Sequence, residues 1–563
     1  MHRAFHCFWR ILLIVLALPI SGTFAAAHAQ SRPNVKLVLQ VTIDGLRADL
    51  IKRYEQGFGA GGFRFLMQKG IYFTNAHYQH ANTETIVGHT VLATGSLPSQ
   101  HGMIGNVWFD REAGELAYNI EDPDHPIIPV RENQSKGAQL DPAQKRSRTQ
   151  GRSPAAILVP TLGDGLAAYY GGRSKIFGVA GKDRSAVAMA GHVGKAFWFS
   201  TDTGDFVTST YYFDAYPEWV SEWNARRQAL EYAGKSWALL NAPSTYLLAD
   251  QDDRPYEVDL KGYGRVFPHP FGTASDKLFH TRILISPVGD QLALDFSKTL
   301  ISNEQLGQDA IPDYLSISFS SVDAVNHFFG PSSLENEDVV LQLDRTLSDL
   351  FAFVDKTVGL KHTLIVLSAD HGMAEMPEYM TKLGYKAGRL DPDEIAAAAN
   401  KAGRNFGVDE IVRFFFRPYL YLDDAKIATA KLDRVQVEHA IADALTDLEG
   451  IALAVASSRL SAQGTNPLLD RVRSNYHASR SGDIYIVQDP YWFLFDKGPV
   501  AAMHGSPWRY DTHVPIIFVG PTIQPKTVHR RVRPADVAPT IAALLGMTSP
   551  GSAQGSPLEE VFQ

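Results

Sequence analysis

The sequence predicts an α/β fold in which a central, mostly parallel β-sheet is flanked by helices. Short apolar, β-branched runs alternate with segments of helical periodicity, as they do in sheets covered by helices. The runs expected to form buried strands span 35–43, 314–319, 363–367 and 514–519. Three of the four lead into Asp or His residues just past the strand's carboxyl end, where open α/β sheets place their sites.

Two segments have the pattern of amphipathic helices. Apolar residues from Val340 to Val354 recur at spacings of three and four, and the segment 535–545 is closed by a glycine. The long ranges 107–310 and 380–500 separate the Asp and His motifs, and we expect them to contain insertions that cover the site. A basic stretch over 131–154 favours a solvated surface loop over a binding patch.

Residues 1–29 have the features of a secretory signal peptide. Basic residues precede an apolar run over 11–18, and Ala27-His28-Ala29 is an A-x-A cleavage site before Gln30. The run is shorter than the about 20 residues that span a bilayer, which disfavours the alternative of an uncleaved anchor. We expect cleavage near Ala29-Gln30, a catalytic domain over 30–563 without a transmembrane segment, and a periplasmic or secreted location.

The chain has a single cysteine, Cys7, and it lies inside this leader. The mature chain therefore has no disulfide, no thiol nucleophile and no cysteine-ligated zinc. The formal net charge is −8 and becomes more negative when the leader's two arginines are removed. We expect no nucleic-acid partner, although a local basic pocket for an anionic substrate is compatible with this charge. The sequence leaves the oligomeric state open.

Six candidate metal ligands come from four separated places in the chain. Asp323 and His327 form a D-x-x-x-H motif, which places both side chains on one face if the segment is helical. Each motif alone is common in turns and on surfaces, but their joint position at strand ends favours a metal site. Three carboxylates and three imidazoles suit zinc or another borderline divalent ion, and six ligands indicate two ions. The six are Asp44, Asp323, His327, Asp370, His371 and His504.

A hydroxyl-rich segment contains the candidate nucleophile, Thr85. Threonine is a poor nucleophile unless a bound cation lowers its effective pKa, and a helix N-terminus after it stabilises an anion. Thr85 precedes the run 86–92, and the competing interpretation is a helix N-cap. Lys182 and Arg184 follow the apolar run 176–180 and form either a clamp for a dianion or a charge pair at a strand end.

As an ordered set, these motifs resemble the alkaline phosphatase superfamily. They most resemble its type I phosphodiesterase/nucleotide pyrophosphatase-like branch, which includes the PafA-type single-threonine bacterial alkaline phosphatases. The resemblance runs from Val41-Thr42-Ile43-Asp44-Gly45 to His504-Gly505-Ser506-Pro507. It implies an alkaline-phosphatase-like sheet with inserted cap segments and two zinc ions. It assigns one ion to Asp323, His327 and His504, and the other to Asp44, Asp370, His371 and the Thr85 hydroxyl.

The same resemblance implies how the site would act. Thr85 would be the nucleophile, Asn106 would donate to a phosphoryl oxygen, and Lys182 and Arg184 would contact the remaining oxygens. Diesterase relatives are not expected to keep the Lys-x-Arg pair, so the pair favours small phosphate monoesters, hydrolysed through a phosphothreonine intermediate. The alternatives are a phosphodiesterase or nucleotide pyrophosphatase, a non-catalytic zinc-binding homologue, and a phosphonate or sulfate ester hydrolase. Sulfatases need a Cys/Ser-x-Pro-x-Arg motif, which residues 85–89 do not match.

Overall fold

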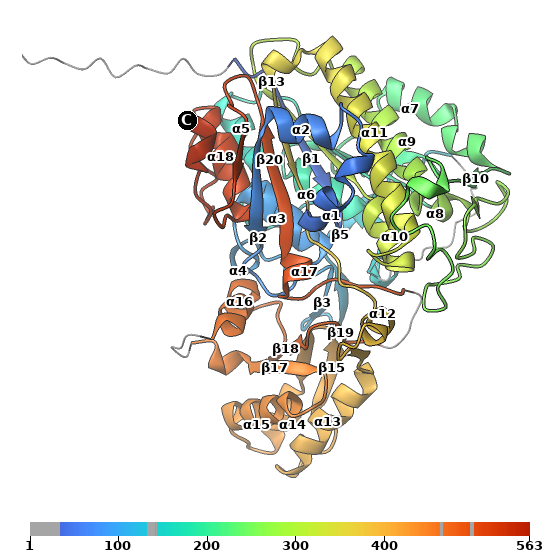
Figure 1. Cartoon of the computed structure of the whole chain (residues 1–563). Helices are drawn as coiled ribbons and strands as arrows, with labels where there is room; N and C mark the ends of the chain where they lie inside the picture. The colour runs from blue at the N-terminus through green and yellow to red at the C-terminus, as the bar shows by residue number, and fades with distance from the viewer. Residues whose placement is uncertain (1–33, 132–140, 142, 462–465, 496–499) are drawn as a thin grey trace, which may run out of the picture. The chain divides into compact units, whose positions relative to one another are not determined.

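A nine-stranded sheet forms the centre of the fold (Figure 1), in the order β21-β2-β20-β13-β1-β12-β7-β8-β9. The computed structural model describes residues 34–131, 141, 143–461, 466–495 and 500–563, so the predicted signal peptide lies outside the described residues. Three predicted runs form β1 (Leu37–Ile43), β12 (Asp313–Phe319) and β13 (Thr363–Ser368). The fourth forms β20 (His513–Val519), which runs antiparallel to both of its neighbours. The predicted mostly parallel α/β sheet is confirmed.

The register of the central strands brings distant parts of the chain to one edge. β1 pairs in parallel with β12 on one side and β13 on the other, with Ile43 opposite Phe319 and Thr42 opposite Ser368. β7 (Ile176–Ala180) adds in parallel to β12. Because these four strands run in one direction and end at nearly one level, the residues that follow them emerge side by side.

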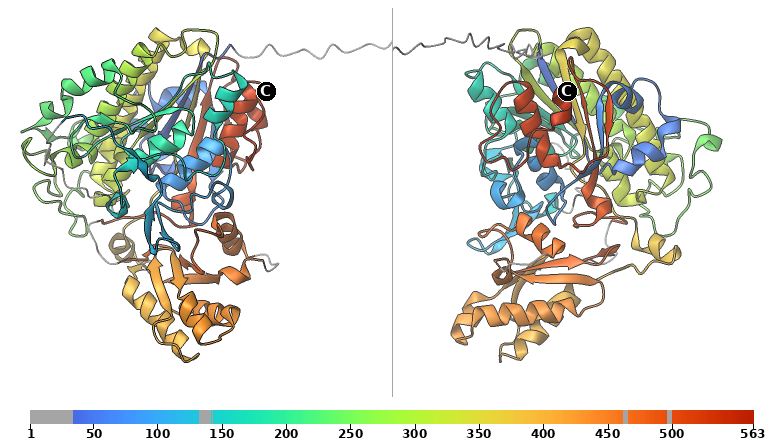
Figure 2. Two further views of the ribbon diagram at one scale, coloured as in Figure 1. Left: turned by 180° about the vertical axis from the view of Figure 1, so that it is seen from behind. Right: turned by 60° about the vertical axis from the view of Figure 1, so that its left-hand side comes forward.

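Helices cover both faces of this sheet (Figure 2). One group packs together on one face: α3 (Thr85–Thr94), α5 (Leu162–Tyr169), α6 (Asp183–Ala190) and α18 (Val537–Leu544). The other face carries α9 (Pro287–Asn303), α10 (Ser321–Phe329) and α11 (Leu334–Thr357). The predicted helix over 340–354 lies within α11. The predicted helix over 535–545 contains the whole of α18. Among the described residues, none of the helices has the length and apolarity needed to cross a bilayer.

A second sheet lies within the range 380–500. It has the order β15-β16-β18-β17, and all of its pairings are antiparallel. Its strands are β15 (Val412–Phe416), β16 (Tyr419–Leu422), β17 (Ile451–Ala456) and β18 (Ile484–Gln488). Helices α13 (Pro392–Arg404) and α15 (Arg434–Thr446) pack on the side away from the central sheet (orange in Figure 1). We call residues 388–493 the cap.

Alternating side chains of β16 explain how the cap joins the rest of the chain. Leu420 and Leu422 pack with the cap helices, whereas Tyr419 and Tyr421 pack with residues of β3 (Val107–Asp110). This period of two is what a strand covered on both faces requires. The cap therefore shares a hydrophobic cluster with the range 107–310.

Part of the basic stretch over 131–154 is buried, so the prediction of a solvated surface loop is wrong there. Arg152 is only 5% exposed, and its Nε donates to Asp183 Oδ2 at 2.8 Å. Asp141 Oδ2 accepts from Arg184 at 2.6 Å. These charges are buried because each is paired with an opposite charge at the start of α6.

Candidate active site

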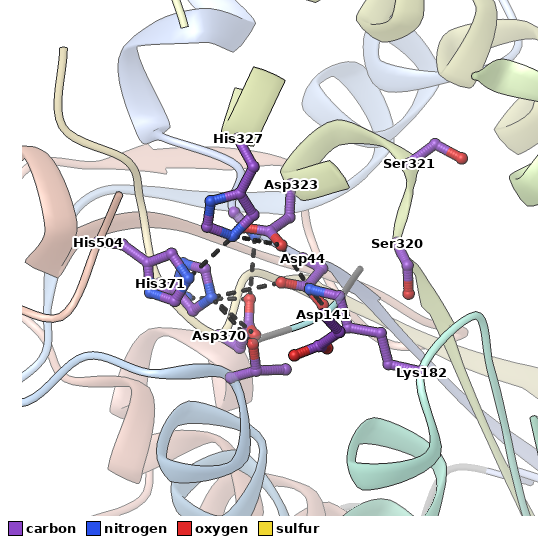
Figure 3. Close-up of polar contacts among 12 residues, drawn as sticks. Asp44, Asp141, Lys182, Ser320, Ser321, Asp323, His327, Asp370, His371 and His504 are labelled. Carbon is purple, nitrogen blue, oxygen red and sulfur yellow. Dashed lines mark hydrogen bonds and ion pairs between the residues drawn. The ribbon is translucent and has the colours of Figure 1, made fainter. Parts of the chain in front are cut away.

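All six predicted metal ligands lie together at the carboxyl edge of the central sheet (Figure 3). Asp44 directly follows β1, Asp370 and His371 follow β13, and α10 after β12 carries Asp323 and His327. His504 comes from the loop after the cap. The three carboxylates are fully buried. Ser320 and Ser321, at the start of α10, point away from this cluster in Figure 3.

The ligand atoms form two tight groups that share His371. The first contains Asp44, Asp370 and His371, and the second contains Asp323, His371 and His504. Within each group the ligand atoms lie within 4.8 Å of one another. His371 Nε2 lies 3.3 Å from both Asp44 Oδ1 and Asp370 Oδ2. The first group is the set expected for one ion.

His327 adjoins the second group. Its Nε2 lies 3.3 Å from Asp323 Oδ2, as the i,i+4 spacing on a helix predicts. His504 Nε2 lies 3.7 Å from Asp323 Oδ1, and its ring stacks on His371 with 3.6 Å between centroids. The tight group thus contains His371 where the resemblance placed His327, and the assignment of ligands to individual ions stays a prediction.

Backbone carbonyls set the tautomer of all three ligand histidines. A carbonyl oxygen only accepts, so each Nδ1 must carry the hydrogen, and each ring, when neutral, presents the Nε2 lone pair to the cluster. The bonds run from His327 to Ala502 (2.9 Å), from His371 to Gly372 (2.7 Å) and from His504 to Thr83 (2.8 Å). Metal-binding histidines are typically oriented in this way.

The cluster has carboxylate oxygens that the protein leaves without hydrogen bonds. Among the described residues, Asp44 Oδ1, Asp323 Oδ1 and Asp370 Oδ2 are buried and have no hydrogen-bond partner. Burying such atoms is costly unless a cation binds them. Together with the three Nε2 lone pairs, they are the mixed oxygen and nitrogen donor set that suits a divalent transition metal. The residues therefore fit the metal ions that the sequence predicts.

Lys182 supplies positive charge to this cluster. Its Nζ lies 2.8 Å from Asp44 Oδ2 and also pairs with Asp323. Burial raises the pKa of Asp44, but the Lys182 ammonium and His371 together outweigh this and hold that pKa below its usual range. Burial lowers the pKa of Lys182, but the two carboxylates outweigh it and raise that pKa above its usual range. Lys182 is therefore fully charged, and the carboxylates around it are ionised.

Thr85 is the first residue of α3 and fully buried, not the N-cap residue that was the alternative interpretation. Its Oγ1 lies 3.5 Å from His371 Nε2 and 3.5 Å from an Arg184 NH2 group. The N-terminus of a helix carries partial positive charge, which favours an anion at this position. The Thr85 oxygen thus lies between the ligand cluster and one of the two predicted phosphate-binding cations.

Asn106 is oriented by groups that the sequence analysis missed. Its Oδ1 accepts from the Ile86 N–H at 3.1 Å, so its amide NH₂ remains the donor. Glu84 Oε2 accepts from the Asn106 N–H at 2.5 Å and from the Asn82 amide at 3.4 Å. The only feature of the sequence that pointed to Glu84 was its position directly before the candidate nucleophile. Asp141, the partner of Arg184, gave none because it lies in the stretch interpreted as a solvated loop.

Helix α3 passes close to Asp370, just beyond the end of β13, at Gly88. A Cβ on Gly88 would lie 1.9 Å from the Asp370 carbonyl oxygen. We expect Gly88→Ala to lower the free energy of unfolding by about 1–3 kcal/mol, because either the helix or the strand end must shift. Urea unfolding measures this change.

Gly165→Ala is the matched control, because Gly165 is also helical and the nearest atom to its added Cβ lies 3.9 Å away. This control should unfold at the same or a slightly higher urea concentration. Equal stability of the two variants would contradict the close approach of α3 to Asp370.

A cavity of about 540 Å³ adjoins the ligand cluster. Its walls include Asn106, Lys182 and Arg184 together with Asp323, His327 and His504. Residues of both long ranges also line it, among them Trp198 and Phe199 from the first and Phe416 and Arg417 from the cap. The volume is in the range of cavities that enclose small organic molecules.

The sequence matches the type I phosphodiesterase / nucleotide pyrophosphatase family over residues 38–507. The chain belongs to this family, and the resemblance inferred from its motifs is confirmed.

Three characterised relatives match the chain over nearly its whole length. Alkaline phosphatase PhoV of Synechococcus elongatus is 32% identical, with 98% of this chain and 100% of PhoV covered. Alkaline phosphatase PafA of Elizabethkingia meningoseptica is 32% identical, with coverages of 97% and 98%. A Myroides odoratus protein named calcium-transporting ATPase is 31% identical, with coverages of 98% and 99%. The crystal structure of wild-type PafA superimposes with a TM-score of 0.84 at 30% identity, covering 95% of this chain and 100% of that one.

Proposed function

We propose that this protein is a metal-dependent alkaline phosphatase that hydrolyses small phosphate monoesters. The observation that carries the proposal is the position of Thr85, whose hydroxyl lies 3.5 Å from both a ligand histidine and Arg184. The relatives named alkaline phosphatase support the same activity.

Two zinc ions are the proposed cofactors, held by the predicted ligands Asp44, Asp323, His327, Asp370, His371 and His504. When bound, they would lower the pKa of the Thr85 hydroxyl and stabilise negative charge on the leaving oxygen. The buried carboxylate oxygens without hydrogen-bond partners and the three Nε2 atoms directed at the cluster support this assignment.

The chain's own residues would hold the phosphoryl group. Arg184 Nη2 lies within reach of Thr85 Oγ1, while its Nη1 donates to Asp141. The Asn106 amide and Lys182 complete the set, since Lys182 becomes available to phosphoryl oxygens once another cation neutralises Asp44 and Asp323. These donors act where charge lies in the transition state of phosphoryl transfer.

The reaction would proceed in two displacements. The deprotonated Thr85 Oγ1 attacks phosphorus in line, the bond from phosphorus to the leaving oxygen breaks, and phosphothreonine forms. Water then attacks the same phosphorus, the bond from phosphorus to Thr85 Oγ1 breaks, and phosphate leaves with the oxygen of the water while a proton from that water restores the Thr85 hydroxyl. Because each displacement inverts the configuration at phosphorus, the overall result is retention.

The Lys182→Ala/Arg184→Ala variant tests the monoester assignment. We expect kcat/KM for an aryl phosphate to fall by about 10²–10³-fold for each donor lost. The matching alkyl aryl diester has one fewer charged oxygen for the pair to contact, so its kcat/KM should fall much less. Spectrophotometric release of the aryl alcohol measures both reactions.

Lys298→Ala is the control, because Lys298 pairs with an exposed carboxylate away from the cavity. It should leave both rates unchanged. Wild-type turnover of the diester that equals or exceeds that of the monoester would contradict this assignment and favour a phosphodiesterase.

We also infer that residues 30–563 act as one catalytic domain in the periplasm or outside the cell, after removal of residues 1–29. The apolar run, the A-x-A site and the confinement of the only cysteine to the leader support this inference. N-terminal sequencing of the exported protein tests it, with Gln30 expected as the first residue.

A further inference from the structure

Arg417 is a cation of the cap that the proposed chemistry does not use. It follows β15 directly and lines the large cavity together with Met503 and His504. It also lines a smaller adjoining hollow, whose walls include Glu84 and again His504. Arg417 therefore lies where the cap meets the ligand cluster.

Aromatic rings hold the Arg417 guanidinium in place. Its central carbon lies 5.0 Å from the ring centroid of Phe495 and 5.9 Å from that of Phe416. Such contacts stabilise a cation but leave its N–H donors unused. Within the described part of the chain, Arg417 forms neither an ion pair nor a hydrogen bond.

The charge of Arg417 is only partly compensated. Burial lowers the pKa of Arg417; Glu84 opposes this shift and Arg146 adds to it, and the net pKa lies below the usual range. Arginine nevertheless stays charged at neutral pH. Glu84 itself is engaged, because its Oε2 accepts from the Asn106 N–H and the Asn82 amide. A partly buried cation of this kind gains most from an anion supplied by a ligand.

An anion bound at Arg417 would be distinct from the transferred phosphoryl group. Lys182 interacts with Asp44 and Asp323, and Arg184 interacts with Asp141. The charges that act on Arg417 are instead those of Glu84 and Arg146. In the proposed function the ions also stabilise the leaving oxygen, and the resemblance assigns His504 to the ion that does not bind Thr85. In an in-line displacement the leaving oxygen lies opposite Thr85. Because Arg417 lines both hollows together with His504, we place Arg417 on the leaving-group side.

We propose that Arg417 binds a second anionic group, carried by the leaving group of the substrate. The preferred substrates are then phosphate monoesters of alcohols that also bear a carboxylate or a second phosphate. A guanidinium fork matches both groups, and its partial burial strengthens the attraction. The inference rests on the proposed monoesterase function and narrows its substrate class.

The test compares three substrates built on a three-carbon alcohol: glycerol 3-phosphate, 3-phosphoglycerate and propane-1,3-diol bisphosphate. Phosphate release is measured for the wild type, Arg417→Ala and Arg417→Lys at constant ionic strength. We expect Arg417→Ala to lower kcat/KM about 10–100-fold for one or both anionic leaving groups, mainly through KM, and less than about twofold for glycerol 3-phosphate. Arg417→Lys should recover part of the loss because it keeps the charge.

Arg413→Ala is the matched control. Arg413 lies on β15, four positions before Arg417; it is exposed, stacks on Phe109 and lies outside the cavity lining. It should leave all three rates unchanged. A loss confined to one anionic substrate supports the inference and identifies the group that Arg417 binds.

Equal losses for all three substrates would overturn the inference, because they would show that Arg417 only packs the cap; no loss for any substrate would overturn it as well. Failure of the wild type to hydrolyse glycerol 3-phosphate would instead contradict the proposed function itself. The two failures are therefore distinguishable.

Discussion

Replacing Thr85 with alanine is expected to lower kcat/KM for an aryl phosphate by at least about 10³-fold, whereas Thr85→Ser should retain measurable turnover. Thr85 is fully buried at the first residue of α3, and its Oγ1 is within 3.5 Å of His371 and Arg184. Alanine removes the hydroxyl oxygen that would form the bond to phosphorus. Serine keeps the hydroxyl and loses only the methyl group that holds its rotamer.

The measurement joins steady-state kinetics to a trapping experiment. Acid quenching during turnover, followed by mass spectrometry of peptides, should detect phosphate on the Thr85 peptide of the wild type and none in the alanine variant. Thr90→Ala is the matched control: Thr90 is buried in the same helix, and its hydroxyl donates to the Ile86 carbonyl at 2.7 Å. It should keep activity within about threefold of the wild type. Unchanged activity of Thr85→Ala would show that the covalent route is wrong.

Removal of metal should have an effect of similar size. Dialysis against a chelator is expected to lower activity by at least about 10³-fold, and Zn²⁺ should restore it. In the described part of the chain, Asp44, Asp323 and Asp370 each have a buried carboxylate oxygen without a hydrogen-bond partner, and the ligand histidines direct Nε2 to the same space. Without bound metal ions, the Thr85 hydroxyl would keep a high pKa, and the leaving oxygen would lack a Lewis acid to stabilise its charge.

Metal analysis by mass spectrometry makes this prediction quantitative. Two ions per wild-type chain are expected, and Asp370→Asn should bind fewer because the amide is a weaker ligand than the carboxylate. Asp344→Asn is the control, since Asp344 is also buried but accepts from the Gly59 and Phe63 N–H groups away from the site. It should keep the full metal content. Full activity of metal-free protein would contradict the metal-dependent mechanism.

The central strands were predictable because the burial of a strand is visible in its own sequence. Each strand is covered on both faces and therefore appears as a continuous apolar run, as in β1 and β13. Asp44 and Asp370 follow their strands within two residues, so the sequence already placed both at the same sheet edge. The spacing of Asp323 and His327 likewise predicted their contact, because a helix brings i and i+4 together.

The direction of β20 and the course of the basic stretch could not be predicted in this way. An apolar run does not show in which direction its strand lies in the sheet. Residues 514–519 therefore predicted a strand but not its antiparallel pairing with β13. Arg152 was predicted to be solvated because charged side chains usually are. It is instead buried beside Asp183, which is 31 positions further along the chain and neutralises its charge. Pairing across such distances leaves no local pattern.

The sequence by itself determined the sheet, the six candidate ligands, Thr85 and the family, because these depend on side-chain periodicity and on motif order along the chain. The tertiary structure alone decided what surrounds them. Lys182 meets Asp323 across 141 positions and Arg184 meets Asp141 across 43, while Arg417 reaches the cavity from the cap. The physical reason is that electrostatic contacts depend on distance in space, whereas periodicity records only which face of an element is buried.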